Sequence, residues 1–588
     1  DVAGVPDGEG ASNSEDNGTG GADGVGGIDG GGGADNDDGN GSTDGNDKGE
    51  PEGDQGTDDE DDKTVVHTTS GAIRGYPWRD DANIISYIDI PYGVFENIFE
   101  APVHPTPLKD VHAVKEHSKR CPQIQDNLYV GNTDCLTLSI FKPLNADNAS
   151  VLFHIHEGNF KTGSGNPDIY GPEYLVSKSI ILVLPNYRLG PLGFLCLQNT
   201  SAPGNAALKD LSLALKWTYN NIANFGGYPG NIAVSGDGTA GALAGYLALS
   251  PKSKDLVSKV ITESGSVLSH WALDRSPIVT ADNLVKLINE FQKWQDVEAV
   301  VKAGEKISFR PCLETNNEDS FMTETPWAMI TNQNISTTFI IGSAMYAGAH
   351  DFLDHSETSI QHLNEDFGRL LPNDLQFATS EERTLAGYKV KTQYFNDSAI
   401  SLNDVEPLAL YLTDSAYLSP GIRTARSLVN SGATVYFYEF SFVGDLNREL
   451  DSIESPVKGA VKGDIVGYLF TQDGVVPKED TKERLMVDQL IELWTAFLDT
   501  GTPVSENIEW KNLEKAIDAN EGWLSINEET SLESGLHVNR LRLWTDIYDK
   551  HFVERNLAYG TSPCVYTVLI LQIIFLLSFF RNASHFTH

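Results

Sequence analysis

The stretch GNIAVSGDGTAGALAGYLALSP, residues 230–251, joins a short apolar run to a longer run rich in alanine and leucine. Residues 230–236 have the length and composition of a buried strand, and residues 240–250 have those of a helix. The turn between them, residues 236–240, carries glycine at its centre. This stretch therefore predicts a strand, a tight turn and a helix in immediate succession.

Similar alternation continues on both sides of this stretch. Residues 150–156 and 179–190 are predicted to be buried strands, and residues 205–225 have the pattern of an amphipathic helix. Two later strands are predicted at residues 337–343 and 433–442. Strands that alternate with helices indicate an α/β fold, with a mostly parallel sheet and helices on both of its faces.

Residues 1–63 form an acidic segment rich in glycine. The first 62 residues hold 20 Asp or Glu against the single basic residue Lys48, and they contain 19 of the 54 glycines. With few large apolar side chains to bury, the segment is predicted to be disordered and to act as a solubilising spacer. A docking or cation-binding arm is the alternative, although TDDEDD lacks the ligand spacing of a calcium loop. The formal net charge of −41 excludes general nucleic-acid binding.

Residues 556–588 form a tail that contains an apolar run. Residues 565–580 are almost uninterrupted in their apolar character and are followed by RNASHFTH. Because this run has no polar face, membrane contact is favoured over a core helix. The tail predicts a glycolipid-anchor signal or a short single-pass segment, which leaves residues 64–555 as the folded domain.

Eight blocks between these tails resemble one known family. They are SYIDIPYG, RCPQ, TDCLTLSIFKP, PNYRLGPLGFL, LALKWTYNNIANFGGYPGNI, ITESGS, YLTDSAYLSP and LWTAFLDTGTP, in the order and spacing of type-B carboxylesterases and cholinesterases. The resemblance spans residues 64–548 and implies the α/β-hydrolase fold. What such a fold does has to be argued from its site.

In this family the strand-to-helix turn reads G-E-S-A-G and presents the serine nucleophile. A match without gaps places Gly238 at the serine position. Glycine supplies no hydroxyl, but it adopts the strained backbone of the turn at little cost. Thr239 is the alternative nucleophile if the match is shifted by one residue, whereas Ser235 and Ser264 are interpreted as structural.

The base and the acid of the family's triad are replaced as well. Lys462, in KGAVKGDIVGYLF, stands at the histidine position, and no histidine occurs between His362 and His537. Ala347 stands at the acid position, with Asp351 four residues further on. An ion-paired or solvent-facing Lys462 is favoured over a lysine that acts as a base or forms a Schiff base.

The loop that forms the oxyanion hole in relatives reads H-G-G-G-F, and here it reads HEGNF. Glu157 and Asn159 replace the first and third of the three glycines, while Gly158 keeps the middle one. A Glu157 carboxylate that faced the pocket would oppose a developing oxyanion. With all four elements changed, the chain is predicted to be a catalytically inactive member, that is, not an enzyme.

The resemblance then implies a function like that of the neurotactin, glutactin, gliotactin and neuroligin group. We expect adhesion or protein recognition on the extracellular face of the plasma membrane or in secreted form, with an extracellular or cell-surface protein as the partner. A homodimer is a further possibility. Two alternatives stay open, namely an esterase that uses Thr239 and a small-molecule binder without turnover. No metal or cofactor is expected.

Secretion would be reflected in cysteines and glycosylation. The blocks RCPQ and TDCL imply a disulfide between Cys121 and Cys135, while Cys196 and Cys312 are interpreted as buried thiols. The candidate N-glycosylation sites are Asn17, Asn40, Asn148, Asn199, Asn334 and Asn396.

Overall fold

The computed structural model describes residues 64–79, 81–288, 291–353, 357–447, 457–514 and 522–554. The acidic segment of residues 1–63 and the tail of residues 556–588 lie outside these ranges, as do Asn17 and Asn40. None of the described helices combines the length and the apolar content that a membrane crossing requires.

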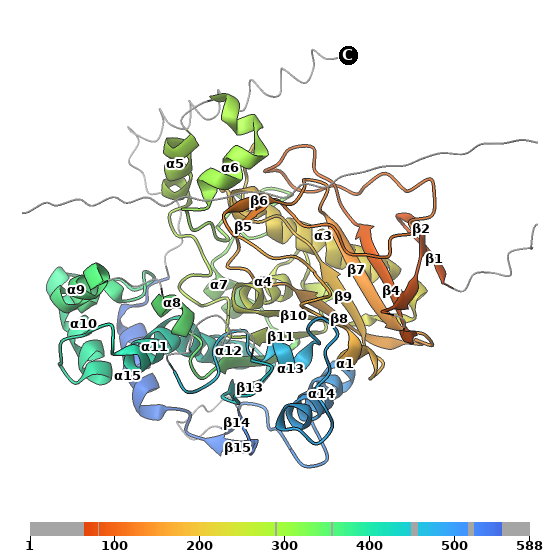
Figure 1. The fold of residues 1–588 in the computed structure, drawn as a ribbon. Helices are drawn as coiled ribbons and strands as arrows, with labels where there is room; N and C mark the ends of the chain where they lie inside the picture. The colour runs from red at the N-terminus through yellow and green to blue at the C-terminus, as the bar shows by residue number, and fades with distance from the viewer. Residues whose placement is uncertain are drawn as a thin grey trace, which may run out of the picture. The chain divides into compact units, whose positions relative to one another are not determined.

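A sheet of eleven strands runs through the domain in the order β15-β14-β13-β12-β11-β10-β8-β9-β7-β4-β3 (Figure 1). The strands from β14 to β9 in this order are parallel, and antiparallel pairs close both edges of the sheet. The bounds, in sheet order, are Ser531–Ser534, Gly522–Ile526, Thr434–Phe440, Thr338–Ala344, Lys259–Glu263, Gly227–Asp237, Ala149–Ile155, Ile181–Pro185, Thr137–Pro143, Asp81–Pro91 and Tyr76–Trp78.

Two small hairpins lie outside this sheet. The strands β1 and β2 pair antiparallel, as do β5 and β6. Their bounds are Val65–Thr68, Gly71–Arg74, Gln123–Gln125 and Leu128–Val130.

The parallel strands are buried on both faces. In β8 every residue from Ala149 to Ile155 is buried, which is why most residues of the strand are apolar. Side chains alternate across a strand, so Val151 and Phe153 enter one core cluster while Leu152 enters another. Each face therefore needs its own cover of helices.

Different helices supply the two covers. Residues of α3, α4 and α12 belong to the cluster on one face, and residues of α1, α13 and α14 belong to the cluster on the other. A third cluster joins α9, α10, α11 and α15, which gather beside one end of the sheet (Figure 1). The helices α1 to α15 are Glu173–Val176, Gly190–Phe194, Ala206–Asn221, Gly238–Leu249, Pro277–Ile288, Val297–Gly304, Pro326–Thr331, Ala349–Leu353, Glu357–Glu365, Ser380–Phe395, Val405–Thr413, Ser419–Asn430, Val466–Leu469, Lys482–Thr500 and Val538–His551.

The predicted α/β-hydrolase architecture is confirmed, and the elements differ from the prediction mainly at their ends. β9 ends at Pro185, earlier than residue 190, because the chain then leads into α2 at Gly190. α3 ends at Asn221, and Ile222–Phe225 continue as a tighter 3-10 turn that stops at Gly226, whose φ is 84°. Helix ends depend on the cap rather than on the apolar repeat.

Candidate functional site

The predicted strand-turn-helix is present as β10 and α4. β10 ends at Asp237 and α4 begins at Gly238, whose φ of +51° lies in the left-handed region that favours glycine. A Cβ built on Gly238 would lie only 2.6 Å from Oε1 of Glu157 and 3.2 Å from Cδ of Lys462. The elbow position thus has no hydroxyl, and the space beside it holds these two side chains.

The small residues of α4 let it lie close to its neighbours. A Cβ on Gly245 would meet Cγ1 of Val267 at 2.6 Å, and one on Gly265 would meet the backbone oxygen of Gly238 at 1.8 Å. Every residue of α4 is buried. The position of the turn is therefore set by packing on both sides, independently of the side chain at its centre.

The carboxylate of Glu157 faces the N-terminus of α4. Its Oε2 accepts hydrogen bonds from Thr239 Oγ1 at 2.5 Å, from Thr239 N at 2.9 Å and from Ala240 N at 3.3 Å. A negative charge is stabilised here because the first N–H groups of a helix lack partners within the helix. The Glu157 carboxylate thus points toward the elbow.

Lys462 completes the charge balance at this site. Its Nζ lies 3.2 Å from Glu157 Oε1 and 3.3 Å from Asn159 Oδ1. The side chain of Lys462 is 10% exposed, and that of Glu157 is 18% exposed. Burial by itself lowers the pKa of Lys462, but attraction to Glu157 and smaller effects from Tyr417, Asp237 and Asp351 outweigh burial, so the pKa lies well above 10.5. Lys462 is therefore a buried, ion-paired ammonium group rather than a solvent-facing one.

Tyr417 contacts both Lys462 and the carboxylate of Asp351. The Lys462 ammonium lies 5.9 Å from the centre of the Tyr417 ring, and Tyr417 donates from its hydroxyl to Asp351 Oδ2 at 2.9 Å. Ala347, at the family's acid position, is fully buried. Tyr417 lies in a stretch of π-helix between α11 and α12, a position that no local sequence pattern marked as functional.

A second pair of acids lies below the elbow, on adjacent strands. Asp237 of β10 and Glu263 of β11 are register partners. Burial, and then repulsion by Asp237, raise the pKa of Glu263 well above its ordinary value of 4.5. Burial beside Asp237 thus favours the protonated form of Glu263 over the charged form.

The two serines near the elbow have structural contacts. Ser235 Oγ lies 2.8 Å from Nδ1 of His154, and both residues are buried. Ser264 Oγ accepts a hydrogen bond from the backbone N–H of Ala344 at 3.0 Å. These contacts support the structural interpretation of both serines.

Two disulfides are present among the described cysteines. The one expected between Cys121 and Cys135 is formed. A second joins Cys196 to Cys312, so the interpretation of these two as free buried thiols was wrong. They are 116 residues apart, and they meet beside Gly204, where a Cβ would lie 2.5 and 2.8 Å from the two sulfurs. An extracellular location agrees with two disulfides.

Four candidate glycosylation sites fall within the described residues. Asn148, Asn334 and Asn396 are exposed, while Asn199 is half-buried and accepts hydrogen bonds from the N–H groups of Ser201 and Ala202. Within the described ranges, no three His, Cys, Asp or Glu side chains gather as metal ligands would.

The match to a known family covers most of the chain. Residues 62–544 match the Carboxylesterase family. The chain belongs to the carboxylesterase family. This carboxylesterase-family chain is 28% identical over 505 residues to venom carboxylesterase-6 of Apis mellifera. The match covers 77% of this chain and 88% of that relative. It is 26% identical over 553 residues to the juvenile hormone esterase of Tribolium castaneum, with 82% and 93% covered.

A solved structure agrees with the fold. The crystal structure of juvenile hormone esterase from Manduca sexta, with OTFP covalently attached, matches with a TM-score of 0.74 and 24% sequence identity. The match covers 83% of this chain and 99% of that chain. At this identity the likeness establishes the α/β-hydrolase fold alone.

These relatives contradict the prediction that the chain is not an enzyme. The family is enzymatic, and the relatives matched over most of the chain are named as esterases. The prediction rested on changes at four elements of the family's motif, whereas the match to the family covers most of the chain. Adhesion is also not indicated by any of the relatives named above.

Proposed function

We propose that this carboxylesterase-family protein hydrolyses carboxylic esters with Thr239 as its nucleophile, in place of a serine at position 238. The observation that carries the proposal is the 2.5 Å hydrogen bond from Thr239 Oγ1 to Glu157 Oε2. A nucleophile bonded to a base that is itself held by a third group is the arrangement that nucleophilic catalysis requires. Lys462, 3.2 Å from the other oxygen of Glu157, is that third group.

The proposed reaction assigns one role to each of these three residues. Thr239 Oγ1 attacks the ester carbonyl carbon while Glu157 accepts the hydroxyl proton. The carbonyl oxygen becomes negative, and the Lys462 ammonium stabilises that charge. The alcohol then leaves with the proton from Glu157, and the acyl group remains bonded to Thr239. Water, deprotonated by Glu157, attacks the acyl carbon, and the bond from this carbon to Thr239 Oγ1 breaks. Glu157 passes its proton to Thr239 Oγ1 as the acid leaves, which restores the hydroxyl and the free carboxylate.

The test is hydrolysis of p-nitrophenyl acetate and butyrate by the parent chain and three variants. We expect Thr239→Ala to lower kcat/KM at least about 1,000-fold and Thr239→Ser to stay within about tenfold of the parent. Thr331→Ala is the matched control, because Thr331 is an exposed helical threonine and its loss should leave the rate unchanged. Equal rates for Thr239→Ala and the parent would overturn the proposal.

Covalent labelling gives a second readout. A fluorophosphonate probe should modify Thr239 in the parent chain and in Thr331→Ala, with the site identified by peptide mass spectrometry. Modification of another hydroxyl would name a different nucleophile, and the absence of any modification would argue against an activated hydroxyl.

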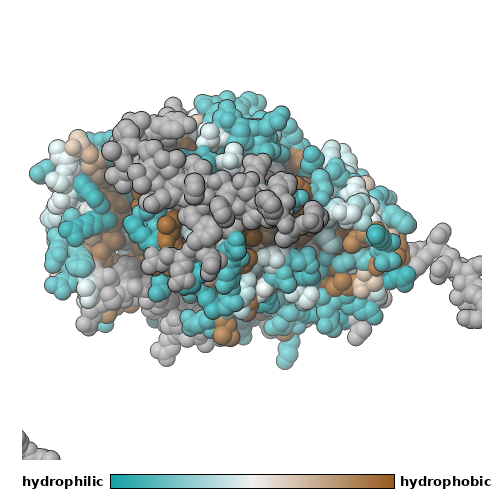
Figure 2. Space-filling model, turned by 90° about the horizontal axis from the view of Figure 1, so that it is seen from above, coloured by the Kyte–Doolittle hydropathy of each residue, from teal (hydrophilic) through white to brown (hydrophobic). Residues whose placement is uncertain are grey.

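We also propose that the outer face recognises an extracellular or cell-surface protein. The supporting observation is an exposed apolar pair on α10, where Leu385 and Tyr388 are 57% and 54% exposed and lie three residues apart on one side of the helix. Among the coloured residues of the face in Figure 2, hydrophilic ones predominate and hydrophobic ones form separate areas. Leu385→Lys should abolish binding of the labelled chain to cells, whereas the control Leu485→Lys, on α14 and 64% exposed, should not.

The proposal extends to the identity of the partner and to attachment to the membrane. A second copy of the chain could be the partner, and sedimentation of the parent and of Leu385→Lys distinguishes a homodimer from another protein. Attachment to the membrane would come from residues 556–588, which lie outside the described ranges. Release of the protein from cells by a phosphatidylinositol-specific phospholipase would support a glycolipid anchor, and retention would favour a span.

A further inference from the structure

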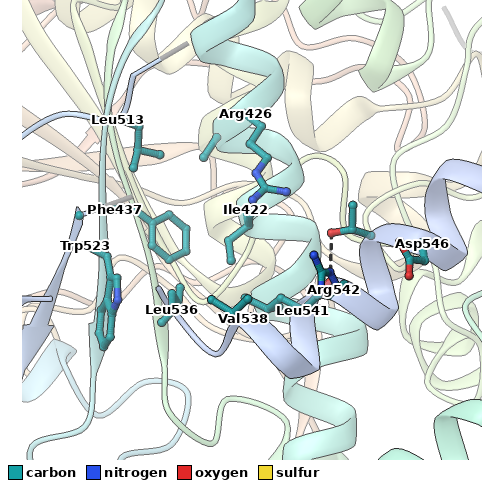
Figure 3. A pocket seen from close by; sticks show the side chains of 13 residues that line it. Ile422, Arg426, Phe437, Leu513, Trp523, Leu536, Val538, Leu541, Arg542 and Asp546 are labelled. Atoms are coloured by element: carbon teal, nitrogen blue, oxygen red, sulfur yellow. Dashed lines mark hydrogen bonds between the residues drawn. The ribbon is translucent and has the colours of Figure 1, made fainter. Parts of the chain in front are cut away.

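A pocket of about 220 Å³ lies between α12, α15 and the strands β13 and β14. None of the residues that line it belongs to the cluster of Thr239, Glu157 and Lys462. Figure 3 shows its lining, with Phe437 and Trp523 on one side and Leu536, Val538 and Leu541 along another. The residues that line the pocket are therefore separate from those of the proposed catalytic site.

Apolar side chains form most of the wall. Phe437 comes from β13, Trp523 from β14, Ile422 from α12 and Leu541 from α15. Because the four elements are far apart in the sequence, their packing leaves a hollow that no single element fills. An apolar group that enters it would be removed from water, which favours binding in proportion to the apolar surface buried.

Two guanidinium groups line the same pocket. Arg426, on α12, is half-buried and extends toward the hollow, and Arg542, on α15, is exposed beside it (Figure 3). Within the described residues, no ion pair involves either arginine, and Nε of Arg426 is buried with no hydrogen-bond acceptor. Asp546 is the one carboxylate in the lining, and it is exposed. The pocket thus carries two positive groups against one negative group, in a chain whose formal net charge is −41.

We propose that this pocket binds an amphipathic carboxylate, such as a medium-chain fatty acid. The alkyl chain would lie against Ile422, Phe437 and Leu541, and the carboxylate would accept hydrogen bonds from Arg426 and Arg542. Charge complementarity selects this ligand over its competitors. A neutral apolar ligand leaves both guanidinium groups without a partner, and a cationic one is repelled by them.

Binding of decanoate to the full chain tests the proposal by calorimetry, with decanol and acetate as comparisons. Decanol keeps the alkyl chain without the charge, and acetate keeps the charge without the chain, so both should bind at least about tenfold more weakly than decanoate. Arg426→Met should weaken decanoate by about tenfold or more. Arg369→Met is the matched control, because Arg369 lies outside this pocket and its side chain is 64% exposed.

Photo-crosslinking of the unaltered chain keeps the proposal testable even if Arg426→Met fails to fold. A decanoate analogue with a diazirine near the end of its chain should label peptides from α12, β13, β14 or α15. Labelling confined to peptides with Thr239 or Lys462 would mean that the acid binds only at the proposed catalytic site, which would overturn the inference. Equal affinity of the Arg426→Met and Arg369→Met variants for decanoate would overturn it as well.

Discussion

Oε1 of Glu157 lies 2.6 Å from the place where a Cβ on Gly238 would stand. Glu157 and Gly238 are 81 positions apart in the sequence, and the HEGNF loop places its carboxylate beside the residue of the elbow that has no side chain. A serine at position 238 would have to displace that carboxylate from Thr239.

Gly238→Ala should therefore destabilise the protein more than a positive φ alone explains. Gly190 is the matched control, because its φ of +53° is nearly the same as the +51° of Gly238 but its Cβ would meet nothing within 4 Å. We expect Gly190→Ala to cost about 1 kcal/mol of unfolding free energy and Gly238→Ala about 2–4 kcal/mol, measured by urea unfolding. Equal losses would show that the Glu157 side chain moves away freely.

Removing both partners of the Glu157–Lys462 pair should cost less than the sum of the costs of removing each one alone. Lys462→Met leaves the half-buried Glu157 carboxylate without its cation, and we expect a loss of about 3 kcal/mol of unfolding free energy. Glu157→Gln should cost a similar amount, and the double variant should lose less than the sum of the two. Additive losses would contradict an interaction between the two charges.

The exposed pair of Lys302 and Glu298 provides the comparison for that cycle. Their side chains are 55% and 47% exposed, and they lie four residues apart on α6. The corresponding variants, Lys302→Met and Glu298→Gln, should each change the unfolding free energy much less than Lys462→Met and Glu157→Gln do.

The two disulfides should differ in their effect on stability. Cys196 and Cys312 are 116 residues apart, whereas Cys121 and Cys135 are 14 apart. The Cys196–Cys312 bond therefore restrains a much longer loop of the unfolded chain. Replacing both cysteines by serine should cost about 5 kcal/mol for Cys196–Cys312 and about 3 kcal/mol for Cys121–Cys135. Urea unfolding of the two double variants measures the difference, and the reverse order would contradict the loop argument.

His156 should make the protein less stable in mild acid. Burial lowers the pKa of His156 from 6.5 to about 4, so the unfolded chain binds the proton first as the pH falls. The stabilisation is present above pH 6.5 and is lost as the pH falls toward 4, by about 2–3 kcal/mol between pH 7 and 4.5.

Replacement of His156 isolates its share of this loss from that of the carboxylates. His156→Gln should show a flatter dependence of the unfolding free energy on pH, measured by urea unfolding at pH 7 and 4.5. Parallel curves for the parent and the variant would mean that His156 takes up its proton equally in both states.

Much of the fold was predictable from local patterns. Long apolar runs predicted the strands β8, β9, β10, β12 and β13. Composition and the spacing of apolar residues predicted the helices α3 and α4. The sequence also predicted that glycine is compatible with the elbow, because the turn needs a residue that tolerates a positive φ.

The partnerships at the site were not predictable in this way. Thr239 and Glu157 are 82 residues apart and Lys462 and Glu157 are 305 apart, and no periodicity links positions so distant. The same holds for Cys196 and Cys312, and for Asp351 and Tyr417. The family's motif identified which positions had changed, but it did not show what the new side chains do together.

The sequence by itself therefore determined the order of strands and helices, the α/β-hydrolase class and the residue at the centre of the elbow. The tertiary structure decided that the carboxylate introduced at position 157 turns toward the helix N-terminus and binds both Thr239 and Lys462. The physical reason is that secondary structure follows from interactions between near neighbours in the chain. The direction of a buried charge depends instead on which donors and counter-charges the packed sheet and helices bring around it.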